Sequence, residues 1–203
     1  MKKKILCIVF VILMIITFIS IRMSKYYGTA CDIYAENGIK SVVTYKVNSA
    51  ISKYLNNSSI DYGKIINIQR NQSDEITAMS IDTKTVNQIS NDLSMEIANC
   101  INNIDSQFGV PLGNMLGYPY LAGKGPYMEV VISPVNYVNY KINSQLLGSG
   151  INQTLHRIKI DFQVELKGLV PFHETKNNLN FEVILAETLI IGKIPENMLS
   201  TLR

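Results

Sequence analysis

An alternation of apolar and polar residues late in the chain restricts its fold more than any other feature. Between residues 158 and 170, every even position holds an apolar residue or glycine, and every odd position except Leu169 is charged or polar. Successive side chains of a strand point to opposite faces, so the pattern predicts a long strand with one buried side. Residues 179–185 alternate in the same way, and a further strand is expected after Pro171, Phe172 and a turn through 174–178.

Two shorter alternations and a hairpin extend the predicted β-structure. Residues 128–132 and 138–142 alternate as well, and each segment predicts one more strand of an antiparallel sheet. Earlier in the chain, the β-prone runs 64–70 and 76–81 flank the polar segment 71–75. That arrangement predicts a β-hairpin.

Two other stretches have the spacing of amphipathic helices. Across residues 30–55, apolar residues recur at steps of three and four, Gly38 weakens the front half, and the polar run 56–59 ends the helix. A second helix is expected to begin after Asp82, a good N-cap, and to close at 106–109. We interpret both apolar stripes as core: Ile39, Val43, Val47, Ala50 and Tyr54 in the first helix, and Val86, Ile89, Leu93, Ile97, Cys100 or Ile101, and Ile104 in the second.

Glycine and proline mark the segments expected to be irregular. Residues 109–126 hold five glycines and three prolines and are predicted to lack regular structure, and residues 147–150 read as a flexible turn. The order of helix, hairpin, helix and four strands predicts an α+β fold. The expected architecture is an N-terminal transmembrane helix followed by a two-layer domain of amphipathic helices on one face of an antiparallel sheet.

The N-terminal segment predicts a membrane anchor. Residues 5–21 form an uncharged run with only Thr17 and Ser20 as polar members, which as a helix spans roughly 25 Å. We expect an uncleaved anchor in 1–25, an amphipathic helix or stalk in 26–56 and an extracytoplasmic α+β domain in 57–203. Cleavage as a signal peptide and lipidation at Cys31 are the less favoured alternatives. Three lysines precede the run, which places the N-terminus in the cytoplasm and predicts a single-pass protein of the cell membrane.

Charge argues against a nucleic-acid partner. Five of the 19 basic residues flank the apolar run, and all 16 acidic residues follow it, so residues 26–203 carry 14 − 16 = −2. The overall charge of +3 thus belongs to the membrane flanks, whereas nucleic-acid binding needs a basic patch on the folded domain. Cys31 and Cys100 would both lie outside the cytoplasm, where two unclustered cysteines permit a disulfide without implying one.

No motif in the chain points to catalysis, a metal or a cofactor. His156 and His173 lack metal-ligand spacing, and no zinc, nucleophile-elbow or acylation pattern occurs. Lys124 lies in a glycine-rich segment, but it precedes the second glycine and a strand follows, unlike a phosphate loop. Three carboxylates that would suit a glycosidase, Glu129, Glu165 and Glu187, are better explained as solvent-facing residues. We therefore expect no enzyme and no cofactor.

Five segments of the chain nevertheless form a recognisable set. They are Val110-Pro111-Leu112-Gly113, Leu121-Ala122-Gly123-x-Gly125-Pro126, Gly150-Ile151-Asn152-Gln153-Thr154-x-His156-Arg157, Pro171-Phe172, and Ala186-Glu187-Thr188-x-Ile190-x-Gly192. In order and spacing these segments resemble the sporulation protein YunB family of endospore-forming Firmicutes. The resemblance covers most of residues 30–203 and is specific around 109–157. It implies a membrane protein made in the mother cell and needed for efficient spore formation, and it supplies no catalytic residues.

The favoured hypothesis is a structural or interaction protein that faces the space between mother-cell and forespore membranes. Its partner would be a protein or a cell-envelope component, met by the loops 109–126 and 147–157. An alternative is a lipid- or hydrophobe-binding module whose groove is lined by the apolar positions of 158–170 and 179–185. An enzyme acting on peptidoglycan comes last. The candidate interaction residues are Asn152, Gln153, Thr154, His156 and Lys124.

Overall fold

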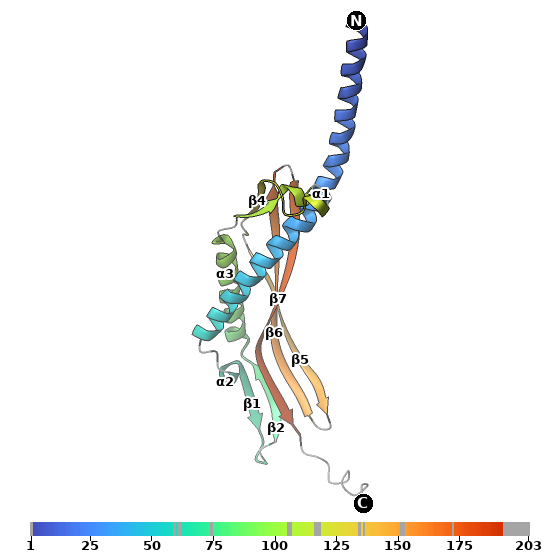
Figure 1. Cartoon of the computed structure of the whole chain (residues 1–203). Coiled ribbons are helices and arrows are strands. Elements are labelled where there is room, and N and C mark those ends of the chain that lie inside the picture. Colours follow the sequence, from blue (N-terminus) through green and yellow to red (C-terminus); the bar gives the residue numbers. More distant parts are fainter. Residues whose placement is uncertain are drawn as a thin grey trace, which may run out of the picture. The chain divides into compact units, whose positions relative to one another are not determined.

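The computed structural model describes the chain as two compact units. It covers residues 2–58, 60, 62–73, 75–104, 107–115, 119–133, 135, 137–150, 153–171 and 173–192, without the side chains of 2–8, 19–20, 22–26, 62, 107 and 115. The first unit combines Met1–Tyr45, Asn103–Pro134 and Glu165–Asn177, and the second combines Lys46–Asn102, Val135–Val164 and Asn178–Arg203. Helices and an antiparallel sheet confirm the predicted α+β class (Figure 1).

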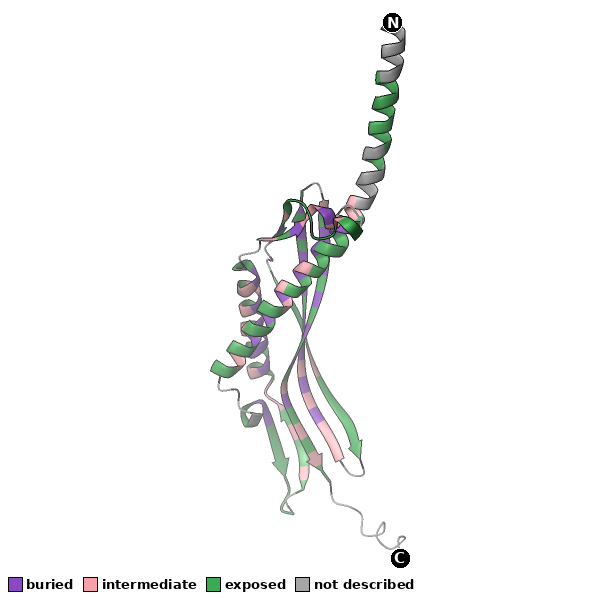
Figure 2. Ribbon diagram, in the orientation of Figure 1, coloured by how far each residue is buried: buried purple, intermediate pink, exposed green. Residues whose placement is uncertain are grey.

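The first helix, α1, runs unbroken from Lys2 to Asn57. The helix predicted over 30–55 is thus its second half, and it ends at Asn57, within the polar run 56–59. From Cys31 onward every fourth residue is buried, which gives the helix a packed side (Figure 2). These buried residues are Cys31, Ala35, Ile39, Val43, Val47 and Ile51.

The beginning of α1 has the opposite character. Its large apolar side chains are exposed, from Val9 at 48% to Ile21 at 67% of their surface (Figure 2). In the part of the chain that the structure describes, no helix combines the length and the apolar content needed to cross a membrane. Of the predicted anchor run, residues 5–8, 19 and 20 have side chains outside the described set.

Gly38, which the sequence predicts to weaken the helix, does not interrupt α1. A Cβ atom at this position would clash with the ring of Phe108, so the glycine lets the ring lie directly against the helix backbone. Tertiary packing here outweighs the low helix propensity of glycine, which costs about 1 kcal/mol relative to alanine.

Near its middle, α1 is hydrogen-bonded to the connection between two long strands, β6 (Gln153–Val170) and β7 (His173–Ile191). The Tyr27 hydroxyl donates a hydrogen bond to the Pro171 carbonyl oxygen at 2.7 Å, and Nε2 of His173 lies 2.8 Å from Oδ1 of Asp32. Burial, followed by the hydrogen bond to Cys31, raises the pKa of Tyr27 to about 12. The phenol therefore stays protonated and remains a hydrogen-bond donor at all physiological pH values.

The second unit contains the predicted hairpin and the second predicted helix. Strands β1 (Ile66–Arg70) and β2 (Ile76–Ile81) pair antiparallel, which confirms the hairpin. Residues Tyr62–Ile65 form the helical turn α2, so β1 begins two residues later than predicted. In the turn, Oδ1 of Asn71 accepts backbone N–H bonds from Ser73 and Glu75 at 3.0 and 2.8 Å.

Helix α3 spans Thr83–Asn102 and begins as predicted after Asp82. Oδ1 of Asp82 accepts the backbone N–H groups of Lys84 and Thr85 at 3.1 and 3.3 Å, the geometry of an N-cap. The predicted stripe is buried, with Ile101 rather than Cys100 on the core side. The end at 106–109 was wrong: α3 stops at Asn102, whose side-chain amide hydrogen-bonds the backbone N–H and C=O of Val135.

In the glycine-rich segment 109–126, the described residues 109–115 and 119–121 form regular elements, which corrects the prediction of an irregular loop there. It contains the end of β3 (Gln107–Pro111), the turn α4 (Leu112–Met115) and the 3₁₀ turn η1 (Pro119–Leu121). The backbone N–H of Gly113 donates to the Lys124 carbonyl oxygen at 2.9 Å, and a Cβ atom at Gly113 would clash with the Leu121 carbonyl oxygen. Here glycine serves close backbone packing rather than flexibility.

The main sheet has five strands in the order β3-β4-β6-β5, with β7 also paired to β6. Strand β6 (Gln153–Val170) confirms the predicted alternation, because its even positions are buried and its odd positions from 163 on are exposed (Figure 2). Strand β4 (Tyr127–Ile132) also matches its prediction. Strand β5 (Asn139–Gly150) includes 147–150, so the flexible turn predicted there was wrong.

Strand β7 runs from His173 to Ile191 and begins earlier than expected. The turn predicted through 174–178 was wrong, because Thr175 and Asn177 continue the buried side of the strand. Polar side chains at these positions concealed the alternation in the sequence.

Cys31 and Cys100 are both free thiols within the described chain, and burial raises the pKa of each.

Candidate binding site

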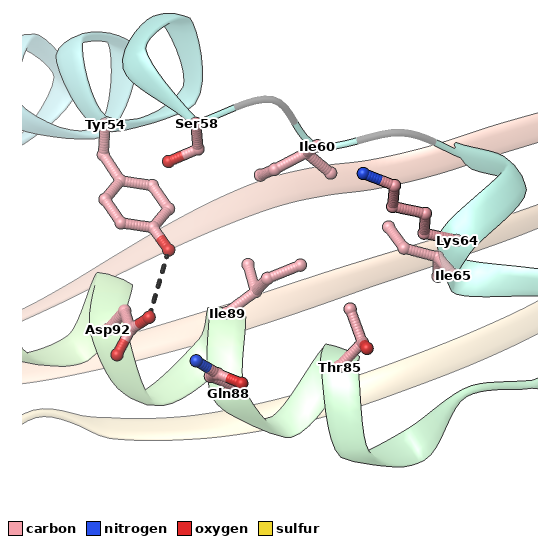
Figure 3. Close-up of a pocket in the computed structure, with 9 residues that line it drawn as sticks. All are labelled: Tyr54, Ser58, Ile60, Lys64, Ile65, Thr85, Gln88, Ile89 and Asp92. Atoms are coloured by element: carbon pink, nitrogen blue, oxygen red, sulfur yellow. Dashed lines mark hydrogen bonds between the residues drawn. The ribbon is translucent and has the colours of Figure 1, made fainter.

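A pocket in the second unit brings together three elements that are separate in the sequence. The last turns of α1, the segment around α2 and the first half of α3 enclose a cavity of about 250 Å³ (Figure 3). The residues around it are Tyr54, Ser58, Ile60, Lys64, Ile65, Thr85, Gln88, Ile89 and Asp92.

The floor of the pocket is apolar and fixed by the local fold. Ile65 is fully buried, Ile89 is almost fully buried, and Ile60 lies beside them (Figure 3). The Ile65 carbonyl oxygen accepts the backbone N–H of Asp82 at 2.8 Å, which ties α2 to the start of α3. Because Asp82 also caps α3, one residue positions both sides of the floor.

The two ends of the pocket carry opposite charges. At one end the Tyr54 hydroxyl donates to Oδ2 of Asp92 at 3.4 Å, and at the other end stands the Lys64 ammonium (Figure 3). Burial, opposed by a hydrogen bond to Ser58 and aided by the Asp92 charge, raises the pKa of Tyr54. The hydroxyl is therefore a donor to the carboxylate and not a base.

The side chains around this pocket offer groups that can bind a ligand. Among the described residues, no group of three or more His, Cys, Asp or Glu side chains is placed to hold a metal ion. The described residues that line the pocket include no cysteine or histidine. What it offers is a carboxylate, an ammonium and an amide around an apolar floor.

The residues predicted to form an interaction surface lie elsewhere. Gln153 and Thr154 open β6 in the second unit, Lys124 is exposed in the first unit, and Asn152 lies outside the described residues. His156 is 2% exposed on β6, and its Nε2 is 3.0 Å from Oγ of Ser144. The structure thus corrects the picture of a loop over 147–157, because most of it belongs to a β-hairpin. The surface role of Lys124, Gln153 and Thr154 stays a prediction.

Sequence reasoning missed the pocket entirely. Lys64 was assigned to a strand, and Gln88 and Asp92 were counted as the polar side of a helix that packs by its other side. No motif links them, since only the tertiary fold brings the end of α1 over α3. The one usable signal was the N-cap at Asp82, which fixed where α3 begins.

The fold and the pocket define an α+β protein in which a long N-terminal helix precedes a domain with one candidate binding site. Residues 107–197 match the model of the family described as "Sporulation protein YunB", which supports the resemblance seen in the sequence. It is also similar to the Sporulation protein YunB of Bacillus subtilis (strain 168), with 19% identity over 168 residues, 77% of this chain. The chain spans 66% of the length of that relative. No solved structure matches the chain.

Proposed function

We propose that the protein is a membrane-anchored, non-catalytic sporulation protein with a structural or interaction role in spore formation. Its domain would face the space between the mother-cell and forespore membranes and meet a protein or a cell-envelope component there. The link to sporulation comes from the family and from the name of the Bacillus subtilis relative. The observation that carries the anchoring is the exposed apolar beginning of α1.

Exposed apolar side chains in this number are costly in water. From Val9 to Ile21, every large apolar side chain whose exposure is described leaves about half or more of its surface open, on all sides of the helix. A helix that is apolar all round needs an apolar environment, either a protein core or a bilayer. Lys2, Lys3 and Lys4 before the run favour a bilayer with the N-terminus in the cytoplasm.

The lipid- or hydrophobe-binding alternative has weaker support. It requires the inward side of β6 to line an open groove. Ile158, Ile160 and Val164 on that side are fully buried, so they are packed as core. The described pocket with charged ends, moreover, suits a polar ligand better than a lipid chain.

Topology and anchoring are tested together. A reporter fused after Arg203 should be active only outside the cytoplasm, and the protein should sediment with membranes. Replacing Ile12 and Ile15 with lysine should release it, because each charge in the bilayer centre costs roughly 3 kcal/mol. Tyr45→Lys, at an apolar residue exposed on the later part of α1, is the matched control and should stay in the membrane fraction.

The biological role is tested by spore yield. A chain lacking residues 1–25 should accumulate in soluble form and fail to support heat-resistant spores, while a chain with an unrelated single-pass anchor should restore them. Activity of a cytoplasm-only reporter at Arg203 would overturn the topology. Full spore yield from the anchorless chain would overturn the role of the membrane.

A further inference from the structure

We propose that the first unit contacts the surface of an anionic phospholipid bilayer through three side chains, those of Tyr120, Lys124 and Tyr127. These residues, called the tyrosine patch below, lie between η1 and the start of β4. Tyr120 is 68% exposed, Tyr127 is 73% exposed, and Lys124 is exposed between them in the sequence. The inference rests on the anchoring proposed above, because only an anchored chain holds this surface beside a membrane.

Contacts within the first unit place the patch near the beginning of α1. The Tyr27 hydroxyl donates to Sδ of Met128 at 3.8 Å, and Met128 directly follows Tyr127. Strand β4 therefore begins beside the part of α1 that follows the uncharged run (Figure 1). Tyr27 stands six positions after Ile21, the last residue of that run, in the same helix, which corresponds to roughly 9 Å of rise.

The length of the uncharged run brings this region close to lipid. The run 5–21 spans roughly 25 Å as a helix, whereas the hydrocarbon core of a bilayer is about 30 Å thick. Because the run is the shorter of the two, the residues after Ile21 are drawn towards the lipid. The polar zone outside the core is roughly 5–8 Å thick on each side. Tyr27 of an anchored chain stands at this zone, with the start of β4 next to it.

The chemistry of the patch suits the polar zone of a bilayer. Tyrosine is enriched there, because its ring is apolar and its hydroxyl is hydrated. A Cβ atom at Gly109 would come within 2.9 Å of the Tyr127 side chain, so this ring lies on the backbone of β3 with most of its surface open. The ammonium of Lys124 carries the charge that anionic headgroups attract, while its aliphatic stem can cover apolar surface.

The backbone holds the patch in a fixed shape. Gly123 and Gly125 have φ values of 75° and 95°, a left-handed conformation that glycine adopts without strain. The carbonyl oxygen of Lys124, between them, accepts the backbone N–H of Gly113 at 2.9 Å. Oδ1 of Asn114 accepts the backbone N–H of Gly123 at 2.7 Å. A contact with lipid therefore orders little additional chain, which lowers its entropic cost.

Two residues of the same unit mark where the contact ends. Glu129 is exposed two positions after Tyr127, and its carboxylate is repelled by anionic lipid, so the contact includes only the start of β4. Tyr45 is 75% exposed, but it follows Tyr27 by 18 positions in α1, roughly 27 Å further along the helix axis. Tyr45 therefore lies beyond the polar zone, although it is as exposed as Tyr127.

The test uses fluorescence, because the chain contains no tryptophan. The full chain is incorporated into nanodiscs of phosphatidylglycerol and phosphatidylcholine, with or without bromine atoms on the acyl chains near the headgroups. The indole of Tyr127→Trp should emit at shorter wavelength than in detergent-free buffer and lose fluorescence in brominated discs. Tyr120→Trp is a second reporter and should behave alike. Tyr45→Trp, nearly equal to Tyr127→Trp in exposure, is the matched control and should not be quenched.

A second substitution tests the charge. In the Tyr127→Trp chain, Lys124→Gln should reduce the quenching to the level found in discs of phosphatidylcholine alone. Lys40→Gln, at an exposed lysine of α1, is the matched control and should leave the quenching unchanged. The thermal unfolding midpoint of each variant verifies that it is folded.

The outcomes separate this inference from the anchoring. Stronger quenching of Tyr127→Trp than of Tyr45→Trp, greatest in anionic discs, supports the proposal. If the chain enters the discs and both variants are quenched equally little, the inference is wrong and the anchoring stands. A shorter emission wavelength without quenching means that protein covers the patch, which also overturns it. Equal quenching in anionic and zwitterionic discs overturns the choice of anionic lipid. A chain that does not enter the discs refutes the anchoring itself.

Discussion

Strands β5 and β6 pair with each other, yet the side chains of β5 are much more exposed to solvent than those of β6. Tyr140 and Phe162 are direct partners with ring centroids 6.1 Å apart, but Tyr140 is 39% exposed and Phe162 only 1%. Further along, Leu146 is 64% exposed opposite His156, which is 2% exposed. Strand β6 has a partner on each edge, whereas β5 ends the strand order and has one. Position in the sheet therefore decides burial more strongly than side-chain polarity does.

The largest loss of stability is expected from a substitution at Phe162, the buried partner of Tyr140. Phe162→Asp places an unpaired charge in the core, so the full chain in detergent should lose its cooperative unfolding transition. Its neighbour Gln163 is exposed, and Gln163→Asp should be tolerated. Tyr140→Asp should cost only about 1–2 kcal/mol through the ring contact. Equal unfolding free energies for Phe162→Asp and Gln163→Asp would reverse the assigned faces.

The second effect compares two isoleucines that face each other. Ile160 on β6 is fully buried and Ile142 on β5 is half-buried. Ile160→Ala should lower the free energy of unfolding by about 2–5 kcal/mol through the lost contacts and the cavity. Ile142→Ala should cost less than half as much. Chemical denaturation of both variants measures the difference, and similar losses would mean that β5 is covered in solution.

The third effect depends on pH and concerns His156. Burial lowers the pKa of its imidazole, and its Nδ1 has no hydrogen-bond partner in the described structure. The folded state therefore favours the neutral ring. Stability is fully present above the ordinary pKa of about 6.5 and is lost as pH falls from there towards the lower folded value. His156→Leu should remove this loss and add about 1 kcal/mol or more at neutral pH, because an unpartnered buried polar atom disappears.

Thermal unfolding of wild type and His156→Leu between pH 7 and pH 5 checks the linkage. The two curves should diverge as pH falls, since carboxylates such as Asp82 change both proteins alike. Parallel curves would show that His156 does not titrate between the two states. His156 was predicted to be an interaction residue, but it is buried. His156→Ala should therefore act through folding rather than through a contact surface.

The smallest effect is expected at the partner of His156. Leu146→Ser exchanges an exposed apolar side chain for a polar one and should change the free energy of unfolding by less than about 0.5 kcal/mol. A larger loss in the same denaturation experiment would mean that Leu146 is covered, for example by a second copy of the chain. The measurement should therefore be repeated at two protein concentrations.

These strands also show which features of the sheet the sequence pattern can predict. Alternation predicted the buried side of β6, because a central strand meets protein on its inward side along its whole length. It failed at the end of β5, where Gly148 and Gly150 read as one turn. Gly148 is an ordinary strand residue paired with Thr154, and the left-handed backbone, with φ of 147°, occurs at Gly150. The two glycines look alike in sequence, and only the register separates them.

The residues of the pocket were harder to predict from the sequence than the strands. Lys64, Gln88 and Asp92 are polar residues of the kind that usually cover a solvated face, and each satisfies its own local pattern. Their convergence depends on how α1 ends and where α2 turns, two tertiary details with no periodic signal. Residues that depend on a single element were predictable, and those that depend on three were not.

The fastening of α1 at Tyr27 limits the freedom of a tethered domain. Only five residues of continuous helix lie between Ile21 and Tyr27, which are roughly 9 Å apart along the axis, and none of the five is glycine or proline. Such a short, continuous helix is stiff. If residues 5–21 lie in a membrane, it would restrict rotation and translation of the first unit relative to them. The first unit would stay at headgroup height with one face towards the bilayer.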